Sequence, residues 1–227
     1  MAKKILVIDD SALMRRVISD IINSGGDYEV AAIARDGVEG FDLIVSNPHL
    51  YSAVILDINM PKMNGLELLE KLQKNRIEQT VIVVSTVAKE GAKETIKALE
   101  LGAFDFVTKP ENYLETKGET FKNNIHKMLD LATGSHRSKV DLRTTSFAKP
   151  GSVVRPAKPK PVVMPRKLEP GNFTGVKTGR KKIVALACST GGPKSLQQVI
   201  PYLPKNLDAP VVLVQHMPAG FTFSLSQ

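Results

Sequence analysis

Short apolar runs recur along the first 130 residues, and each of them precedes a stretch with apolar residues at helical spacing. A run of four to eight apolar residues is the length of a buried β-strand, whereas apolar residues three and four positions apart form one face of a helix. The sequence therefore predicts alternating strands and helices. The predicted strands are residues 5–8, 28–34, 53–56, 81–84 and 104–107.

The helical pattern is clearest directly after the first strand. Ser11 stands where a helix cap is expected, and Gly25-Gly26 stands where the helix should end. The expected buried face is Leu13, Met14, Val17, Ile18, Ile21 and Ile22. The same spacing recurs at Leu66, Leu69 and Leu72, at Ile96 and Leu99, and at Phe121, Ile125, Met128 and Leu129.

Five strand–helix units in succession predict an α/β fold with a doubly wound parallel sheet. Parallel strands need crossover connections, and right-handed crossovers place helices on both faces of the sheet. Ligands of such sheets bind beyond the carboxyl ends of the strands, near the switch in strand order. The residues that follow each predicted strand are therefore the first candidates for chemistry.

A basic, proline-containing segment divides the chain. Residues 1–132 carry a net charge of −4, residues 133–180 carry +9, and residues 181–227 carry +3, which together give the +8 of the whole chain. The middle segment holds six of the 14 prolines and almost no periodic apolar pattern. We interpret it as a flexible linker between a first domain, residues 1–132, and an incomplete second domain, residues 181–227. A nucleic-acid contact is the alternative interpretation of its charge, but the segment lacks interleaved aromatic residues, so no nucleic-acid partner is expected.

Composition excludes several classes of protein. A single cysteine cannot form an internal disulfide, and no Cys/His cluster has the spacing of a zinc site. The apolar run near the N-terminus stops after four residues at Asp9-Asp10, too short for a signal peptide or a membrane span. We expect a soluble, cytoplasmic protein without membrane insertion.

Charged and hydroxyl residues follow the predicted strands. The first strand ends in Asp9-Asp10, the third in Asp57, the fourth in Ser85-Thr86, and the fifth leads to Lys109. Because parallel strands end at one edge of the sheet, these side chains should converge there. Three carboxylates in one small site repel each other unless a cation joins them, so the sequence predicts a hard, oxygen-binding ion, Mg²⁺.

The last segment contains a second strand–turn–helix pattern. Residues 182–187 predict a strand that leads into Cys188-Ser189-Thr190-Gly191-Gly192-Pro193, and residues 195–203 predict a helix. The next predicted strand, residues 210–214, leads to His216. Adjacent parallel strands would place His216 beside Ser189, the pairing that activates a serine for ester hydrolysis.

Other interpretations of this turn stay open. Glycine-rich strand-to-helix turns also bind phosphate or simply close the chain. Cys188 is a rival nucleophile by reactivity, although it precedes the turn and is expected to point inward.

The motifs at the strand ends resemble those of a response-regulator receiver domain over residues 1–130. The resemblance rests on Asp9-Asp10-Ser11, on residues 56–61 with Asn64-Gly65, and on Val107-Thr108-Lys109-Pro110. It implies that Asp57 accepts a phosphoryl group from a sensor kinase and that Lys109 stabilises the product. It also implies Mg²⁺ ligation, phosphoryl binding and a mobile aromatic side chain. These further roles fall to Asp9, Asp10, Asp57 and the Asn59 carbonyl for Mg²⁺, to Ser85 for the phosphoryl oxygens, and to Phe106 as the aromatic residue.

The last segment resembles the opening of the catalytic domain of CheB-type chemotaxis protein-glutamate methylesterases. The matching residues are 189–193, Leu203-Pro204, and 214–218 with Gly220-Phe221-Thr222. This resemblance implies hydrolysis of glutamate methyl esters, and deamidation of glutamine, on chemoreceptors. Ser189 and His216 would be catalytic, and a chemotaxis histidine kinase would switch the enzyme on through Asp57, releasing a receiver that covers the esterase cleft in the unphosphorylated state.

The sequence departs from this second family at two points. Ala187 stands where the family usually has glycine, and the family's catalytic aspartate belongs to a later strand than the last one present here. In triad enzymes the loss of that role costs about 10⁴ in rate. We expect the 227-residue chain to be inactive as an esterase and to be a fragment or a truncated product. A receiver that acts as a binding switch or phosphate sink, with an inactive tail, is the alternative function.

Overall fold

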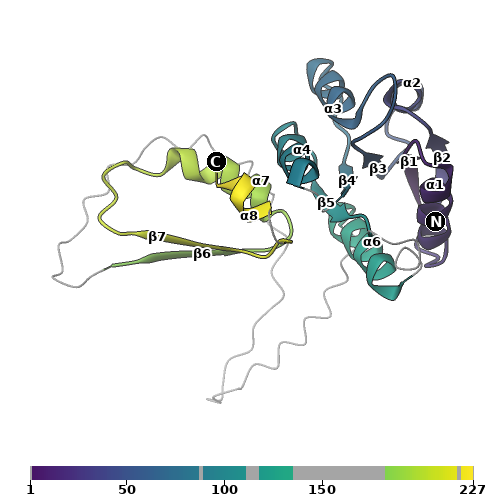
Figure 1. Cartoon of the computed structure of the whole chain (residues 1–227). Coiled ribbons are helices and arrows are strands. Elements are labelled where there is room, and N and C mark those ends of the chain that lie inside the picture. The colour runs from purple at the N-terminus through teal and green to yellow at the C-terminus, as the bar shows by residue number, and fades with distance from the viewer. Residues whose placement is uncertain (1, 87–88, 111–117, 135–181, 219–220, 227) are drawn as a thin grey trace, which may run out of the picture. The chain divides into compact units, whose positions relative to one another are not determined.

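The computed structural model describes residues 2–86, 89–110, 118–134, 182–218 and 221–226. Its first part contains a five-stranded parallel sheet (Figure 1). The strand order β2-β1-β3-β4-β5 switches direction at β1, as expected for a doubly wound fold. The strands are β1 (Lys3–Ile8), β2 (Tyr28–Ala34), β3 (Ala53–Asp57), β4 (Val81–Ser85) and β5 (Asp105–Thr108).

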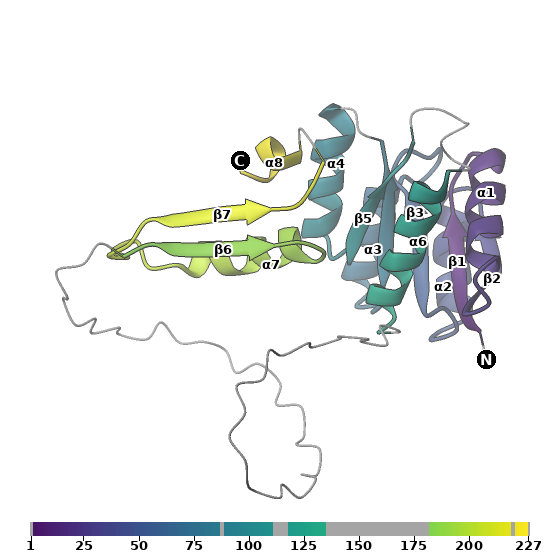
Figure 2. The ribbon, with the colours of Figure 1, turned by 90° about the horizontal axis from the view of Figure 1, so that it is seen from below.

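Within the described residues, five helices cover the two faces of this sheet. On one face, α2, α3 and α4 pack against strand residues such as Leu6 and Ile8, and on the other, α1 and α6 pack against Ile5 and Val7. Figure 2 shows α1 and α6 in front of the sheet and α2 and α3 behind it. The prediction of helices on both faces is confirmed. The bounds are α1 (Ala12–Asn23), α2 (Gly37–Ser46), α3 (Gly65–Lys74), α4 (Lys89–Glu100) and α6 (Glu119–Ala132).

The inner strands β3 and β4 and most of β1 are apolar because both of their faces are buried, whereas buried and more exposed residues alternate in the edge strand β2. Ile5, Leu6, Val7 and Ile8 are all fully inaccessible to solvent. A strand that is buried on both sides shows a continuous apolar run instead of an alternating pattern. The predicted strands therefore match the observed ones closely, and β3 and β4 each extend one residue further, to Asp57 and Ser85.

Helix α1 has the predicted cap but not the whole predicted buried face. The Ser11 hydroxyl accepts a hydrogen bond from the Met14 backbone N–H at 3.3 Å. Val17, Ile18, Ile21 and Ile22 are buried, whereas Leu13 is 48% exposed. The prediction for Leu13 was wrong because the first turn of α1 follows the loop at the carboxyl edge of the sheet, where little of the core remains to cover it.

The last part contains a two-stranded parallel sheet. Strands β6 (Val184–Cys188) and β7 (Val211–Gln215) pair with Cys188 opposite Gln215. Between them lie α7 (Gly192–Val199) and the 3₁₀ helix η1 (Ile200–Tyr202), and after β7 comes α8 (Phe221–Leu225). The helix predicted over residues 195–203 is found, but α7 begins three residues earlier and ends at Val199, where the 3₁₀ helix follows. Val212, Leu213 and Val214 of β7 are 45% to 62% exposed.

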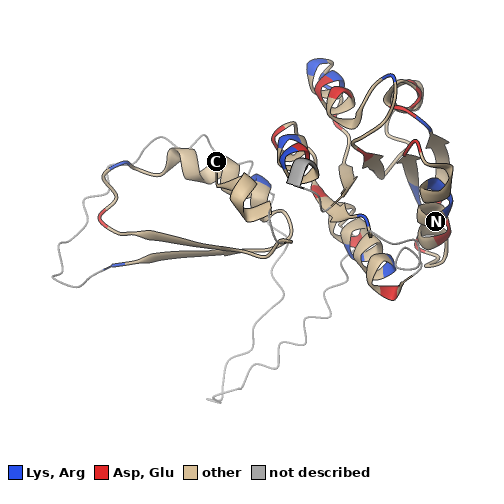
Figure 3. Cartoon of the chain, in the orientation of Figure 1, with Lys and Arg blue, Asp and Glu red and all other residues tan. Residues whose placement is uncertain are grey.

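Charge is distributed unevenly over the described elements. Acidic and basic residues intermingle over α3 and α4, whereas β6 and β7 carry no charged residue (Figure 3). None of the helices in the described ranges is long and apolar enough to cross a membrane. The predicted linker, residues 133–180, lies outside the described residues except for Thr133 and Gly134.

Candidate functional site

Three carboxyl groups lie together where β1 and β3 end. Asp9, Asp10 and Asp57 each offer an oxygen atom, and these atoms lie within 4.8 Å of one another. Asp9 is 1% and Asp57 6% exposed, whereas Asp10 is exposed to solvent. The predicted convergence of these residues is therefore found, because β1 and β3 are neighbours in the parallel sheet.

Lys109 reaches the same pocket from the end of β5. Its Nζ lies 2.6 Å from Asp57 Oδ2 and 2.9 Å from Asp9 Oδ2, and its side chain is 14% exposed. The second oxygen of each carboxylate accepts a backbone N–H: Ser11 donates to Asp9 Oδ1 and Ile58 to Asp57 Oδ1, both at 2.8 Å. Both buried carboxylates are thus fixed in orientation at each oxygen.

The pocket has an excess of negative charge. Burial raises the pKa of Asp57 above its ordinary value; the Lys109 charge opposes this rise, and the Asp9 charge adds to it. Burial alone would lower the pKa of Lys109, but the charges of Asp57 and Asp9 outweigh that effect and raise it. One ammonium group compensates one of the three carboxylates. The pocket as a whole then carries a net charge of −2, and its carboxylate oxygens are donors that fit a hard divalent cation.

The loop after Asp57 folds back onto the strand end. The Gly65 N–H donates to the Ile58 carbonyl at 2.8 Å, and a side chain at Gly65 would collide with the Asp57 carbonyl oxygen. Asn64 and Glu67 form a capping box that starts α3, with hydrogen bonds of 2.9 and 2.8 Å. Asn59 is exposed in this loop, and its side-chain amide donates to Glu94 of α4 at 3.2 Å.

A second support for this loop was missed by the sequence analysis. Lys62, which has a φ of 63°, places its Nζ 2.6 Å from Asp36 Oδ2. Asp36 caps α2 by accepting the N–H groups of Val38 and Glu39, and the hydrogen bond from Lys62 lowers its pKa. An aspartate ahead of a helix is a recognisable cap signal, but its pairing with Lys62 depends on the tertiary fold.

Ser85 and Thr86, the two hydroxyl residues at the end of β4, face different surroundings. Ser85 is 3% exposed, and its Oγ lies 2.7 Å from Thr95 Oγ1, whereas Thr86 is exposed. The sequence singled out Ser85, and the structure gives it a buried position. The contact with Thr95 of α4 had no signal in the sequence.

The turn after β6 carries Ser189, and the segment after β7 carries His216; both residues are exposed. They follow the paired residues Cys188 and Gln215, so they leave their strands at the same edge. Gly191 has a φ of 72°, a conformation that favours glycine and lets the chain enter α7 directly. The sequence analysis expected His216 beside Ser189 on adjacent parallel strands; the strands are adjacent and parallel, and the placement of the two side chains beside each other stays a prediction.

Gln215 joins these two segments and was not singled out from the sequence. Its Nε2 donates to the Ser189 carbonyl and to the His216 carbonyl, both at 3.0 Å. The His216 N–H in turn donates to the Cys188 carbonyl at 3.0 Å. The side-chain amide of Gln215 thus connects the backbone carbonyls of the two candidate catalytic residues through hydrogen bonds.

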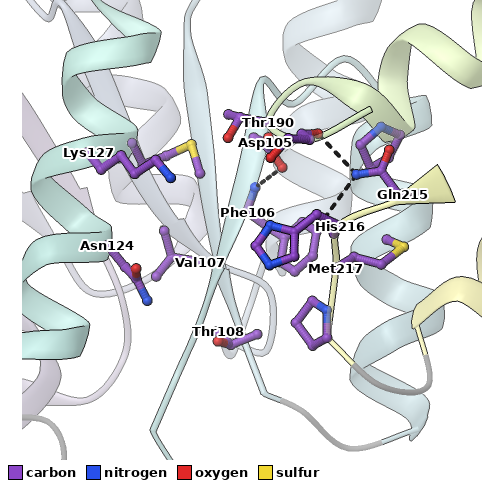
Figure 4. Close-up of a pocket in the computed structure, with 14 residues that line it drawn as sticks. Asp105, Phe106, Val107, Thr108, Asn124, Lys127, Thr190, Gln215, His216 and Met217 are labelled. Atoms are coloured by element: carbon purple, nitrogen blue, oxygen red, sulfur yellow. Dashed lines mark hydrogen bonds between the residues drawn. The ribbon is translucent and has the colours of Figure 1, made fainter. Parts of the chain in front are cut away.

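Ser189 and His216 line a pocket of about 300 Å³ that also includes residues of β5 and α6 (Figure 4). The Asp105 carboxylate accepts the Gly191 N–H at 2.6 Å, and burial raises the pKa of Asp105. The Phe106 ring stacks on the Phe221 ring with centroids 4.9 Å apart. The residue expected to be a mobile aromatic therefore has an aromatic partner.

Two protein families match the chain. Residues 5–117 match the response regulator receiver domain, and residues 184–227 match the CheB methylesterase. A protein-glutamate methylesterase/protein-glutamine glutaminase of Pyrococcus horikoshii is 40% identical, over 99% of this chain and 55% of the relative. One of Thermotoga maritima is 41% identical, over 98% of this chain and 57% of the relative.

A solved structure is also similar. The response regulator domain of Thermotoga maritima CheB is 36% identical, with a TM-score of 0.49, and the match covers 59% of this chain and 96% of that domain. The chain spans a little more than half the length of the curated relatives named above. The two matched segments, and relatives that align along nearly all of its length, show that the chain is similar to the CheB-type response regulators, with a receiver match in its first part and a CheB methylesterase match in its last part.

Proposed function

We propose that the pocket formed by Asp9, Asp10, Asp57 and Lys109 is a phosphoacceptor site. Asp57 attacks the phosphorus of a phosphohistidine on a chemotaxis histidine kinase, the bond from phosphorus to the histidine nitrogen breaks, and an acyl phosphate forms. The observation that carries this proposal is the buried Asp57 carboxylate, held 2.6 Å from the Lys109 ammonium group. Lys109 offsets the charge of the added phosphoryl oxygens, which would otherwise repel Asp9.

A divalent cation belongs to this proposal, and Mg²⁺ is the ion whose preferences fit it. Asp9, Asp10, Asp57 and the backbone carbonyl of Asn59 would hold it. Bound there, the ion would reduce the repulsion between the attacking carboxylate and the phosphoryl oxygens. Asp9 keeps its orientation through the Ser11 N–H, and Asp57 through the Ile58 N–H. Ser85 would donate its hydroxyl proton to a phosphoryl oxygen, and Phe106 would change its exposure with the switch.

We propose that phosphorylation controls an esterase built on Ser189 and His216. In this reaction His216 takes the Ser189 hydroxyl proton, Ser189 attacks the carbonyl of a glutamate methyl ester, and methanol leaves. Water then releases the glutamate. A glutamine side chain would lose ammonia by the same route. The substrates would be methyl-accepting chemoreceptors, and the location would be the cytoplasm. The hydrogen bonds of Gln215 support this assignment, because they hold the backbone of both residues at one edge of the two-stranded sheet.

The proposed organisation keeps the three segments predicted from the sequence. A regulatory domain occupies residues 1–132, a linker residues 133–180, and the first part of a catalytic domain residues 181–227. Helix α6 ends at Ala132, and β6 begins at Val184, which supports both boundaries.

The phosphoacceptor assignment is tested with a small radiolabelled phosphodonor and Mg²⁺. Wild-type protein should acquire acid-stable, base-labile label, as an acyl phosphate does, and Asp57→Asn should acquire none. Asp42→Asn, which changes an exposed aspartate of α2, is the matched control and should label like the wild type. Labelling of Asp57→Asn at the wild-type level would refute the assignment.

The esterase assignment is tested in a chain that continues to the length of the relatives. With a methylated chemoreceptor as substrate, Ser189→Ala should lower methanol release by several orders of magnitude. Ser195→Ala, which changes an exposed serine of α7, should leave the rate unchanged. Equal rates for Ser189→Ala and the wild type would remove Ser189 from the mechanism.

A further inference from the structure

A buried pair of hydroxyl groups lies between the end of β4 and helix α4. Thr95 is fully inaccessible to solvent, and its Oγ1 lies 2.7 Å from Ser85 Oγ and 2.6 Å from the Gly91 carbonyl oxygen. Ser85 Oγ is also 3.3 Å from the Gly91 carbonyl oxygen and 3.4 Å from that of Thr86. Two hydroxyl protons therefore serve this small cluster of oxygen atoms.

The Ser85 hydroxyl, which the proposed switch needs for the phosphoryl group, is already hydrogen-bonded within this cluster. Thr95 and Ser85 each supply one proton, and a carbonyl oxygen can only accept. Thr95 donates to Ser85 across the 2.7 Å contact, and within the described residues the Ser85 hydroxyl itself donates to the carbonyl oxygens of Thr86 and Gly91. To donate to a phosphoryl oxygen, Ser85 must turn its proton away from this cluster.

The backbone around the cluster is packed closely enough to make the contact specific. A Cβ at Gly91 would lie 2.7 Å from both the carbonyl and the hydroxyl oxygen of Thr86, and 3.4 Å from Ser85 Oγ. The absence of a side chain at Gly91 lets the first turns of α4 approach the strand end. Ala92 and Ile96, on either side of Thr95 in sequence, are buried as well, so Thr95 has little freedom to move.

We propose that Thr95 is a positioning residue that holds the Ser85 hydroxyl against α4 and restrains it from binding a phosphoryl group on Asp57. The proposal rests on the function proposed for Asp57 and Ser85. When Ser85 turns toward the phosphoryl group, the hydrogen bond between Ser85 and Thr95 of α4 is lost. Thr95 keeps its hydrogen bond to the Gly91 carbonyl, so no buried group is left unpaired. The phosphorylation state of Asp57 is thereby linked to the contacts of α4.

The test compares the whole wild-type chain with Thr95→Val and Thr95→Ser. The probe is beryllofluoride, a phosphoryl mimic, titrated in the presence of Mg²⁺ and followed by the NMR amide signals of residues 85, 91 and 109. Thr95→Val keeps the shape of the side chain and removes the hydroxyl. It should bind beryllofluoride about threefold to tenfold more tightly, the worth of one intramolecular hydrogen bond. Thr95→Ser keeps the hydroxyl and should bind like the wild type.

A second measurement separates positioning from a general effect on packing. Without beryllofluoride, the signals of Thr95→Val should shift from the free wild-type positions toward the bound ones. In a Ser85→Ala background, Thr95→Val should not change the affinity, because the group that it releases is absent. If Thr95→Val folds poorly, Thr95→Ala serves as the second variant, with the same expected direction.

Each other outcome has a distinct meaning. Failure of the wild-type chain to bind beryllofluoride would refute the phosphoacceptor function itself. Binding by the wild type with an equal or weaker affinity for Thr95→Val would overturn only the role of Thr95. The same would follow if Thr95→Ser matched Thr95→Val, or if Thr95→Val had its full effect without the Ser85 hydroxyl.

Discussion

Lys109 Nζ lies 2.6 Å from Asp57 Oδ2, and the same nitrogen lies 2.9 Å from Asp9 Oδ2. A single ammonium group thus bridges two carboxylates that end different strands, 52 and 100 residues away in sequence. Buried charges are tolerated only when they are paired and hydrogen-bonded. The pocket is therefore held together by one cation from the protein, and it keeps enough negative charge to bind another.

Replacing the Asp57 carboxylate by an amide should stabilise the fold when no divalent cation is present. The pKa of Asp57 is raised in the folded protein, so its charged form is disfavoured by folding, mainly through burial. Stability is lost as the pH rises from the ordinary aspartate range through the folded pKa. The unfolding free energy of Asp57→Asn should exceed that of the wild type at neutral pH, and the difference should shrink as the pH falls through that window. Urea unfolding from pH 3 to pH 8 in a chelator measures it. A difference that grows on acidification would contradict the sign of the pKa shift.

Removing the charge of Lys109 should destabilise the fold strongly. Lys109→Met keeps most of the side-chain length but leaves Asp9 and Asp57 unpaired, and breaking a buried pair in this way costs about 3 kcal/mol or more. Millimolar Mg²⁺ should restore part of the loss, because it would take over the neutralising role. The control is Lys74→Met, whose side chain is 76% exposed, with an expected change within about 0.5 kcal/mol. Equal stability of Lys109→Met and the control in a chelator would show that the ion pairs of Lys109 with Asp9 and Asp57 do not stabilise the fold.

A methyl group at Gly65 should disturb the loop that follows Asp57. In Gly65→Ala the new Cβ would collide with the Asp57 carbonyl oxygen, backbone that cannot move aside cheaply. Overpacking of this kind costs about 1–3 kcal/mol, and beryllofluoride binding at Asp57 should weaken with it. Gly134→Ala is the comparison, because Gly134 has a φ of 64° and no atom within 4 Å of the added Cβ. It should lose stability through backbone strain alone, without any change in binding. Thermal unfolding together with beryllofluoride titration distinguishes the two variants.

The capping box of α3 should contribute measurably to stability. Asn64→Ala removes the acceptor for the Glu67 N–H at the helix start, and loss of such a cap costs about 1 kcal/mol. Glu67→Gln keeps a side-chain oxygen for the Asn64 N–H and should cost less. Chemical denaturation of the two variants supplies the comparison. A larger loss for Glu67→Gln would mean that the charge at the helix start outweighs the cap itself.

Much of the fold could be predicted because the inner strands of the parallel sheet are buried on both faces. Their continuous apolar runs and the residues after them placed Asp9, Asp57 and Lys109 at one edge, where the structure has them. Helix α2 carried a weaker signal in the sequence than the other helices. Two of its glycines permit close packing: a Cβ at Gly37 would meet Met63, and one at Gly40 would meet Ile8. Glycines lower helix propensity, so the local sequence of α2 disfavours a helix while the tertiary packing requires these glycines.

The finer parts of the site depend on contacts between distant residues. No spacing rule connects Lys62 to Asp36, Thr95 to Ser85 or Gln215 to the Ser189 carbonyl, because each contact is created by packing of elements that the sequence only places in order. Asp10 and Asn59 illustrate the converse: their positions follow from the strand ends, but their exposure does not.

The half-exposed strand β7 has a consequence for calorimetry. Apolar groups that already face solvent in the folded chain add little to the heat capacity gained on unfolding, which arises mainly from newly hydrated apolar surface. With Val212, Leu213 and Val214 between 45% and 62% exposed, unfolding of β7 should add little to the heat-capacity change. The increase in heat capacity on unfolding should come mainly from the five-stranded sheet and its helices.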